Sequence, residues 1–182
     1  MARLYMVRHG EAAAGFGEHD DPGLSEKGRG QAEAAAKTLL DLRLKDSISS
    51  PLLRCQETAA PFVKQTGRPF RIEQAVAEIP TPKAYEANRQ IWLRGVMAGN
   101  WAEQPDFTPW RLKMQKTLID VPSDLVIFSH FVAINVIVGL ATGNDKVVNF
   151  SPANGSITIL ETDGKALKFV SFGAEAAGGK VL

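Results

Sequence analysis

The most informative stretch of the sequence is DLVIFSHFVAINVIVGLA, residues 124–141. A short apolar run ends at Ser129 and His130, and a longer apolar run follows at once. Short apolar runs are typical of strands buried on both faces, and longer ones of buried helices. The stretch therefore predicts a buried strand over residues 124–129 and a buried helix over residues 132–141, with a histidine between them.

The amino terminus repeats this arrangement. Residues 3–8 (RLYMVR) are mostly apolar with strand character, and His9 follows directly. Ligands of open α/β sheets bind at the carboxyl ends of the strands. We therefore expect His9 and His130 to meet over one edge of a sheet, although they lie far apart in the sequence.

Strands and helices alternate along the rest of the chain. A glycine-rich loop over residues 9–23 precedes Ser25, which is a suitable N-cap for a helix that ends near residue 42. We expect further strands over residues 47–50 and 70–72, helices over 51–65, 83–97 and 108–120, and a hairpin of residues 156–161 and 166–172. This pattern predicts an α/β fold: a three-layer sandwich whose mostly parallel central sheet has helices on both faces and an antiparallel hairpin near the C-terminus. We expect a single domain over residues 1–182.

The composition limits the classes of function. The 182 residues are 45% hydrophobic and 23% charged, and the formal net charge of +1 gives no support to a nucleic-acid or membrane-surface role. The single cysteine, Cys55, excludes an internal disulfide framework and a cysteine-rich zinc site, and it suits a reducing compartment. The apolar run at residues 126–141 is too short to span a membrane, and no targeting segment is evident. We therefore expect a cytoplasmic protein, and no feature indicates an oligomeric state.

Two arginines are expected beside the two histidines. Arg8 precedes His9, and Arg54 lies near the start of the helix that follows the second predicted strand. Guanidinium groups bind phosphate through paired hydrogen bonds, and an imidazole can carry a phosphoryl group. Cations around a transferring phosphoryl group stabilise its charge, and an alcohol leaving group needs a proton donor. Arg8, His9, Arg54 and His130 therefore predict a site for phosphoryl transfer.

Five sequence blocks, in order, resemble those of the histidine phosphatase superfamily, also called phosphoglycerate mutase-like. They are R-H-G-E at residues 8–11, P-G-L-S-x-x-G-x-x-Q-A at 22–32, S-S-P-L-L-R-C-Q-E-T-A at 49–59, S-H at 129–130 and N-G-S-I at 154–157. The second block has one residue more after its proline than the family pattern. R-H-G alone is a weak signal, whereas five blocks in the family's order are specific.

The resemblance implies a role for each matching residue. His9 would be the phosphorylated nucleophile, and Arg8, Arg54 and His130 would hold the phosphoryl oxygens. Glu78 occupies the place of the family's proton donor, with Glu11 and Glu57 as rival acids. The family needs no metal and no organic cofactor, and the expected partner is a small phosphorylated substrate.

Three departures from the family pattern bear on the substrate. Pro80 and Pro82 follow Glu78, which indicates a differently shaped substrate lid. Phe131 stands where the family usually has glycine, so its ring is expected either to narrow the pocket or to pack in the core. The chain is shorter than typical phosphoglycerate mutases, which favours a phosphatase. A phosphomutase, a phosphohistidine phosphatase acting on proteins and a non-catalytic phosphoryl-binding domain are the alternatives.

Overall fold

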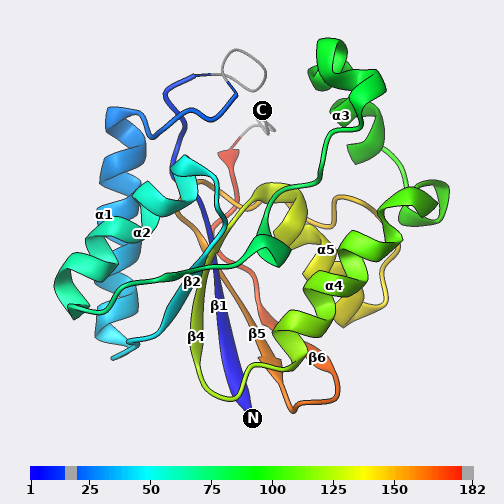
Figure 1. Cartoon of the computed structure of the whole chain (residues 1–182). Coiled ribbons are helices and arrows are strands. Elements are labelled where there is room, and N and C mark those ends of the chain that lie inside the picture. Colours follow the sequence, from blue (N-terminus) through cyan, green and yellow to red (C-terminus); the bar gives the residue numbers. More distant parts are fainter. Residues whose placement is uncertain (15–19, 178–182) are drawn as a thin grey trace.

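The computed structural model describes residues 1–14 and 20–177, in which a central sheet has helices on both faces (Figure 1). The strands are β1 (Ala2–Arg8), β2 (Ser47–Ser49), β3 (Arg71–Ile72), β4 (Leu125–Ser129), β5 (Ile157–Thr162) and β6 (Leu167–Ser171). The α-helices are α1 (Glu26–Asp41), α2 (Leu53–Thr66), α3 (Arg89–Met97), α4 (Thr108–Ile119) and α5 (Phe131–Thr142). Short 3-10 helices are η1 (Gln74–Val76), η2 (Lys83–Asn88), η3 (Trp101–Glu103) and η4 (Pro105–Phe107).

The sheet has the strand order β3-β2-β4-β1-β5-β6. The four strands from β3 to β1 are parallel, whereas β5 is antiparallel to β1 and forms a hairpin with β6. The predicted fold class is therefore confirmed. Arg8 pairs with Ser129 at the ends of β1 and β4, so the two histidines that follow these residues leave the sheet at the same edge.

Alternate residues of β1 enter two separate apolar cores, as expected for a strand buried on both faces. Tyr5 and Val7 belong to the core beneath α1 and α2, and Leu4 and Met6 belong to the larger core beneath α4 and α5. Figure 1 shows these two helix pairs on opposite sides of the sheet. The central strands are thereby packed on both faces, and the residues at their carboxyl ends follow directly from this packed region.

The helix predicted over residues 83–97 differs from the observed structure. The first half is the 3-10 helix η2, none of whose side chains is buried, and the second half is α3. Leu93 and Val96 of α3 are buried, so only this half has an apolar face to hold it as an α-helix. No helix in the described ranges is long and apolar enough to cross a membrane.

Candidate active site

His9 is buried at the carboxyl end of β1, and both of its ring nitrogens are engaged. Nδ1 lies 2.7 Å from the carbonyl oxygen of Gly10, and Nε2 accepts a hydrogen bond of 3.2 Å from Nε of Arg54. A guanidinium can only donate, so the ring proton is on Nδ1 and Nε2 has a free electron pair. Burial, together with the charges of Arg54 and Arg8, holds the pKa of His9 well below its usual value. The imidazole is therefore neutral, with a nucleophilic nitrogen facing a cation.

The N-G-S-I block holds the backbone that carries this histidine. Asn154 Nδ2 donates to the carbonyl oxygen of His9 at 3.0 Å, and Gly155 N donates to that of Arg8 at 2.9 Å. Nη1 of Arg8 donates to the carbonyl oxygen of Pro152 at 2.8 Å. The N-G-S-I block therefore fixes the backbone of the R-H-G-E block through these hydrogen bonds.

The loop after His9 packs directly against the first turn of α1, and two glycines make this approach possible. A Cβ on Gly10 would lie 2.4 Å from the carbonyl oxygen of Gly28, and a Cβ on Gly28 would lie 2.1 Å from that of Glu11. Glu11 N donates to Oε1 of Gln31 at 2.8 Å, and Ser25 caps the helix by accepting from Gly28 N at 3.0 Å. The first two sequence blocks are thus the two sides of one close contact.

The S-S-P-x-x-R-x-x-x-T-A block brings Arg54 into the site. Arg54 is buried in the first turn of α2, where its guanidinium reaches His9. Thr58 Oγ1, one turn later, donates to the carbonyl oxygen of Arg54 at 2.6 Å and accepts from Gly10 N at 3.0 Å. The threonine of the motif therefore links the arginine-bearing helix to the loop of the histidine.

Arg8 lies over the ring of Phe131, with its guanidinium carbon 5.1 Å from the ring centroid. Burial lowers the pKa of Arg8 to about 10, which still leaves it charged at neutral pH. Phe131 is itself buried as part of the larger core. Of the two expectations for this residue, packing is what the structure shows, and the aromatic face supports a cation of the site.

His130 is fully buried, and its ring meets that of His9 edge to face, with centroids 5.2 Å apart. Nε2 of His130 lies 2.7 Å from Oγ of Ser50 and 3.3 Å from Sγ of Cys55. Burial and the charge of Arg54 hold the pKa of His130 well below its usual value, so this imidazole is also neutral. The expected meeting of the two histidines over the sheet edge is observed.

Glu78 lies at the amino end of α5. Its carboxylate accepts hydrogen bonds from the backbone N–H groups of Val132 and Ala133, both at 3.1 Å, and from that of Ile79 at 3.0 Å. Burial raises the pKa of Glu78, although these bonds and the charge of Arg54 act in the opposite direction. Its charge in turn acts on Arg8. Glu78 is thus within electrostatic range of Arg8 and Arg54, and the charges of these two arginines also act on His9 and His130.

The two rival acids have structural contacts instead. Glu11 accepts a hydrogen bond from Oγ of Ser25 at 2.9 Å and pairs with Lys27 at 3.2 Å, and these bonds lower its pKa. Glu57 accepts from Leu24 N at 2.6 Å, and Arg29 lies 4.0 Å away. Both carboxylates thus secure the start of α1. The remaining histidine, His19, lies outside the described residues.

A family model described as the histidine phosphatase superfamily (branch 1) matches residues 4–109, more than half of the chain. The chain belongs to this superfamily. Two relatives are each named 2,3-bisphosphoglycerate-dependent phosphoglycerate mutase. The protein from Thermoplasma acidophilum is 24% identical over 173 residues, with 87% of this chain and 86% of that protein covered. The protein from Bartonella henselae is 39% identical over 92 residues, with 47% of this chain and only 42% of that protein covered.

Solved structures show the same fold. A mycobacterial glucosyl-3-phosphoglycerate phosphatase matches with a TM-score of 0.74 and 21% identity, over 97% of this chain and all of that chain. A phosphoserine phosphatase from Entamoeba histolytica, solved with 3-phosphoglyceric acid, matches with a TM-score of 0.73 and 20% identity, over 96% of this chain and 98% of that chain. At identities this low, the structural similarity establishes the fold of the chain but gives no information about its substrate.

The sequence did not predict that two further residues, Arg89 and Ser50, lie near the site. Arg89 begins α3, and burial followed by the charge of Arg54 lowers its pKa, so it lies within electrostatic range of the site. Residues 79–110 lack a family motif, so no signal marked it. Ser50, which contacts His130, lies inside the S-S-P motif, and the motif itself was the signal that could have identified it.

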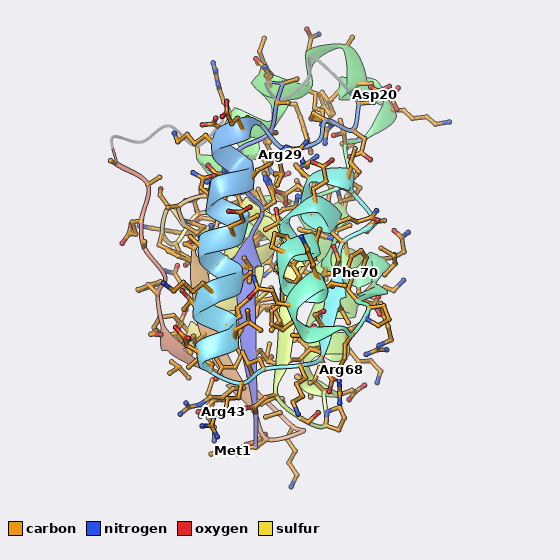
Figure 2. All side chains as sticks on the ribbon, turned by 90° about the vertical axis from the view of Figure 1, so that its left-hand side faces the viewer. Met1, Asp20, Arg29, Arg43, Arg68 and Phe70 are labelled. Atoms are coloured by element: carbon orange, nitrogen blue, oxygen red, sulfur yellow. The ribbon has the colours of Figure 1, made fainter. Side chains whose placement is uncertain are left out.

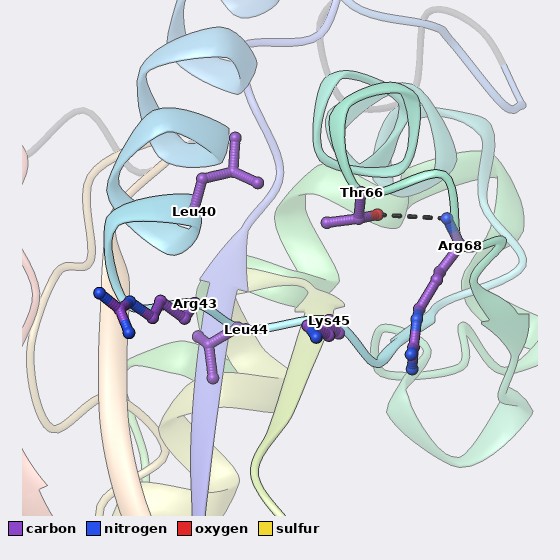
Figure 3. Close-up of a pocket in the computed structure, with 6 residues that line it drawn as sticks. All are labelled: Leu40, Arg43, Leu44, Lys45, Thr66 and Arg68. Atoms are coloured by element: carbon purple, nitrogen blue, oxygen red, sulfur yellow. Dashed lines mark hydrogen bonds between the residues drawn. The ribbon is translucent and has the colours of Figure 1, made fainter.

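A surface pocket of about 390 Å³ lies away from this site (Figure 3). It is lined by Leu40, Arg43, Leu44, Lys45, Thr66 and Arg68. These residues lie at the carboxyl ends of α1 and α2 or just before β2. The pocket is therefore near the amino ends of the parallel strands, whereas His9 follows the carboxyl end of β1. Figure 2 shows Arg43 and Arg68 at the end of the molecule opposite to Asp20. Arg68 pairs with Asp46 at 3.0 Å, and cations at helix carboxyl ends have a ready structural explanation.

Proposed function

We propose that this protein is a metal-independent phosphatase that hydrolyses a phosphomonoester through a phosphohistidine intermediate at His9. The observation that carries the proposal is the contact between Arg54 and His9. It leaves a neutral imidazole with its free electron pair on Nε2, directed into a group of cations. A nucleophile and the charges that stabilise a phosphoryl group are thus in one place.

In the first step, Nε2 of His9 attacks phosphorus while the bond from phosphorus to the ester oxygen breaks. Arg8 and Arg54 bind the equatorial oxygens, and entry of the phosphoryl group displaces the resting contact between Arg54 and Nε2. The departing oxygen takes a proton from the carboxyl group of Glu78. In the second step, water attacks the phosphorus of phospho-His9, the N–P bond breaks, and Glu78 takes a proton from the water. Orthophosphate leaves, and His9 and Glu78 return to their starting states.

Glu78 suits the role of proton donor better than Glu11 or Glu57. Its raised pKa keeps part of the population protonated at a higher pH than an ordinary glutamate allows. The carboxylates of Glu11 and Glu57 are held by the start of α1, and the pKa of Glu11 is lowered. The acid therefore comes from the segment between the second arginine and the second histidine.

A phosphomutase is the second candidate function. The observation that favours it is the name of both relatives, each a 2,3-bisphosphoglycerate-dependent phosphoglycerate mutase. The two candidates share phospho-His9 and differ in the acceptor, which is water for the phosphatase and a second hydroxyl group for the mutase. Dependence of turnover on a bisphosphate primer, with phosphoglycerate as substrate, distinguishes them. We expect no such dependence here.

The test of the proposed function is hydrolysis of p-nitrophenyl phosphate in the presence of a chelator, by the wild type and by His9→Ala. We expect chelator-resistant hydrolysis that disappears in the variant. A phosphoenzyme that is stable to alkali and labile to acid, trapped from the wild type and absent from His9→Ala, would identify the intermediate. Hydrolysis that persists in His9→Ala would contradict the assignment of the nucleophile.

A further inference from the structure

The second histidine of the site contacts a hydroxyl group through a short hydrogen bond. Nε2 of His130 lies 2.7 Å from Oγ of Ser50, and both residues are fully buried. The hydroxyl group also accepts a hydrogen bond of 3.3 Å from Leu52 N. That bond takes up one electron pair of Ser50 Oγ and leaves the hydroxyl proton free to be donated.

The position of the single ring proton decides what His130 can do. A neutral imidazole has one N–H group and one free electron pair, so one nitrogen donates and the other accepts. Sγ of Cys55 donates to the carbonyl oxygen of Ser129 at 3.3 Å, so its proton is already used. The Ser50 hydroxyl is then the group that can supply a proton to Nε2 of His130.

We propose that Ser50 is a positioning residue whose hydroxyl group donates to Nε2 of His130 and thereby places the ring proton on Nδ1. The Nδ1–H group is then the donor that His130 offers to a phosphoryl oxygen. The opposite tautomer would donate from Nε2 to Ser50 and would turn a free electron pair toward an anion. This inference rests on the proposed function in assuming that a phosphoryl group occupies the space between the histidines and arginines.

The arrangement of His9 explains why the tautomer of His130 matters. The ring proton of His9 is taken by the carbonyl oxygen of Gly10, and its Nε2 is the attacking atom. His9 therefore offers no N–H group to the substrate. Among the described imidazoles of the site, His130 alone can donate to the phosphoryl oxygens, and it does so only when Nε2 is the acceptor. Nδ1 of His130 lies 3.9 Å from Sγ of Cys55, and this long contact leaves Nδ1 available to a stronger acceptor.

The direct test is the tautomer of His130 in the wild-type protein. Long-range ¹H–¹⁵N correlation spectra of protein labelled with ¹⁵N-histidine distinguish the two neutral forms. The spectra are recorded at pH 7.5 with and without inorganic phosphate, and His130→Gln assigns the signals. We expect a protonated Nδ1 and an unprotonated Nε2 in both spectra. A protonated Nε2 in the phosphate-bound wild type overturns the proposal without recourse to a Ser50 variant.

Ser49 provides a matched control for the variant Ser50→Ala. It is equally buried, and its hydroxyl group donates to the carbonyl oxygen of Ser50 at 2.9 Å rather than to a histidine. We expect Ser50→Ala to lower kcat/KM about 10- to 100-fold, by analogy with the loss of a group that orients a metal-bound histidine, and to yield a mixture of His130 tautomers. Ser49→Ala should keep the Nδ1–H form and retain kcat/KM within about threefold. A wild-type tautomer and wild-type kcat/KM in Ser50→Ala overturn the proposal.

The two readouts separate this inference from the proposed function. A protonated Nδ1 in a protein that hydrolyses no phosphomonoester contradicts the phosphatase and leaves the role of Ser50 in setting the tautomer intact. Hydrolysis through His9 by a wild-type protein whose His130 is protonated on Nε2 contradicts only the role of Ser50. If Ser50→Ala does not fold, the wild-type spectra still decide the matter.

Discussion

Glu78 accepts hydrogen bonds from three backbone N–H groups, two of them at the amino end of α5, and burial nevertheless raises its pKa. A glutamate in this condition acts as an acid at low pH and loses that ability as the pH rises through its raised pKa. The kcat/KM for an alkyl phosphate should therefore fall on the alkaline side of the pH profile. An aryl phosphate, whose leaving group needs little protonation, should show a much weaker fall. Measuring both profiles on the same preparation checks this.

The substitution Glu78→Gln extends this prediction. We expect it to lower kcat for an alkyl phosphate by about 10²- to 10³-fold and to affect p-nitrophenyl phosphate far less, because general acid catalysis is lost. Glu57→Gln is the control, since Glu57 contacts Leu24 and Arg29 instead. It should leave the ratio of the two activities unchanged. A phosphohistidine phosphatase would need no acid, so an unchanged ratio in Glu78→Gln would favour that alternative.

At the scale of an element, α1 contains two glycines with opposite surroundings. A Cβ on Gly28 would meet the backbone of Glu11, whereas a Cβ on Gly30 would meet nothing within 4 Å. We expect Gly28→Ala to lower the free energy of unfolding by about 1–3 kcal/mol and to reduce kcat/KM, because the loop after His9 must move. Gly30→Ala should raise the free energy of unfolding by up to about 1 kcal/mol, because alanine favours the helix. Urea unfolding and steady-state kinetics of both variants provide the measurement.

Helix α3 provides a second pair of variants. Arg89 lies within electrostatic range of Arg54 and Glu78, whereas Arg94 is exposed on the same helix. Figure 1 shows α3 at the same end of the molecule as the carboxyl ends of the parallel strands. We expect Arg89→Gln to raise KM for a phosphomonoester about fivefold, which corresponds to about 1 kcal/mol of anion binding, with little change in kcat. An equal effect of Arg94→Gln would show that only the overall charge matters.

At the scale of the whole molecule, the two buried histidines link stability to pH. Their pKa values are held low in the folded state, so unfolding takes up protons once the pH falls below about 6.5, the ordinary pKa of histidine. Each histidine then costs up to about 1.4 kcal/mol of stability per pH unit. The raised pKa of Glu78 acts in the opposite sense, because a protonated Glu78 favours the fold.

A variant isolates the contribution of one histidine. Urea unfolding at pH 7.5, 6.5 and 5.5 should show that the wild type loses more stability on acidification than His130→Gln does. We propose that the chain unfolds as one domain, so each experiment should show a single transition followed equally by fluorescence and circular dichroism. An identical pH dependence of wild type and variant would contradict a neutral, buried His130.

Much of this architecture could be predicted from the sequence, because its signals are local. A short apolar run followed by a histidine occurs twice, and parallel strands bring their carboxyl ends together, so the meeting of His9 and His130 was foreseeable. The choice among Glu11, Glu57 and Glu78 depended on hydrogen bonds between distant segments, which no spacing reveals. Their catalytic roles stay predictions.

Other features could not be foreseen for physical reasons. Phe131 had two possible environments, and only the packed structure shows its ring beneath Arg8. Arg89 lies beyond η2, which has no buried side chain and therefore no apolar pattern to mark its conformation. Where packing is sparse, sequence periodicity carries little information about structure.

Cys55, the chain's only cysteine, is buried against His130, and burial raises the pKa of its thiol. Thiol reagents attack the exposed thiolate, so Cys55 can react only when the packing around α2 opens. The rate at which Cys55 is labelled therefore reports how often the packing around α2 opens next to His130, and no cysteine has to be introduced for the measurement. An anion that binds between the arginines should lower the rate of Cys55 labelling in proportion to the fraction of protein that has bound it. The binding of a colourless, unreactive ligand can therefore be measured through a residue that does not contact the ligand.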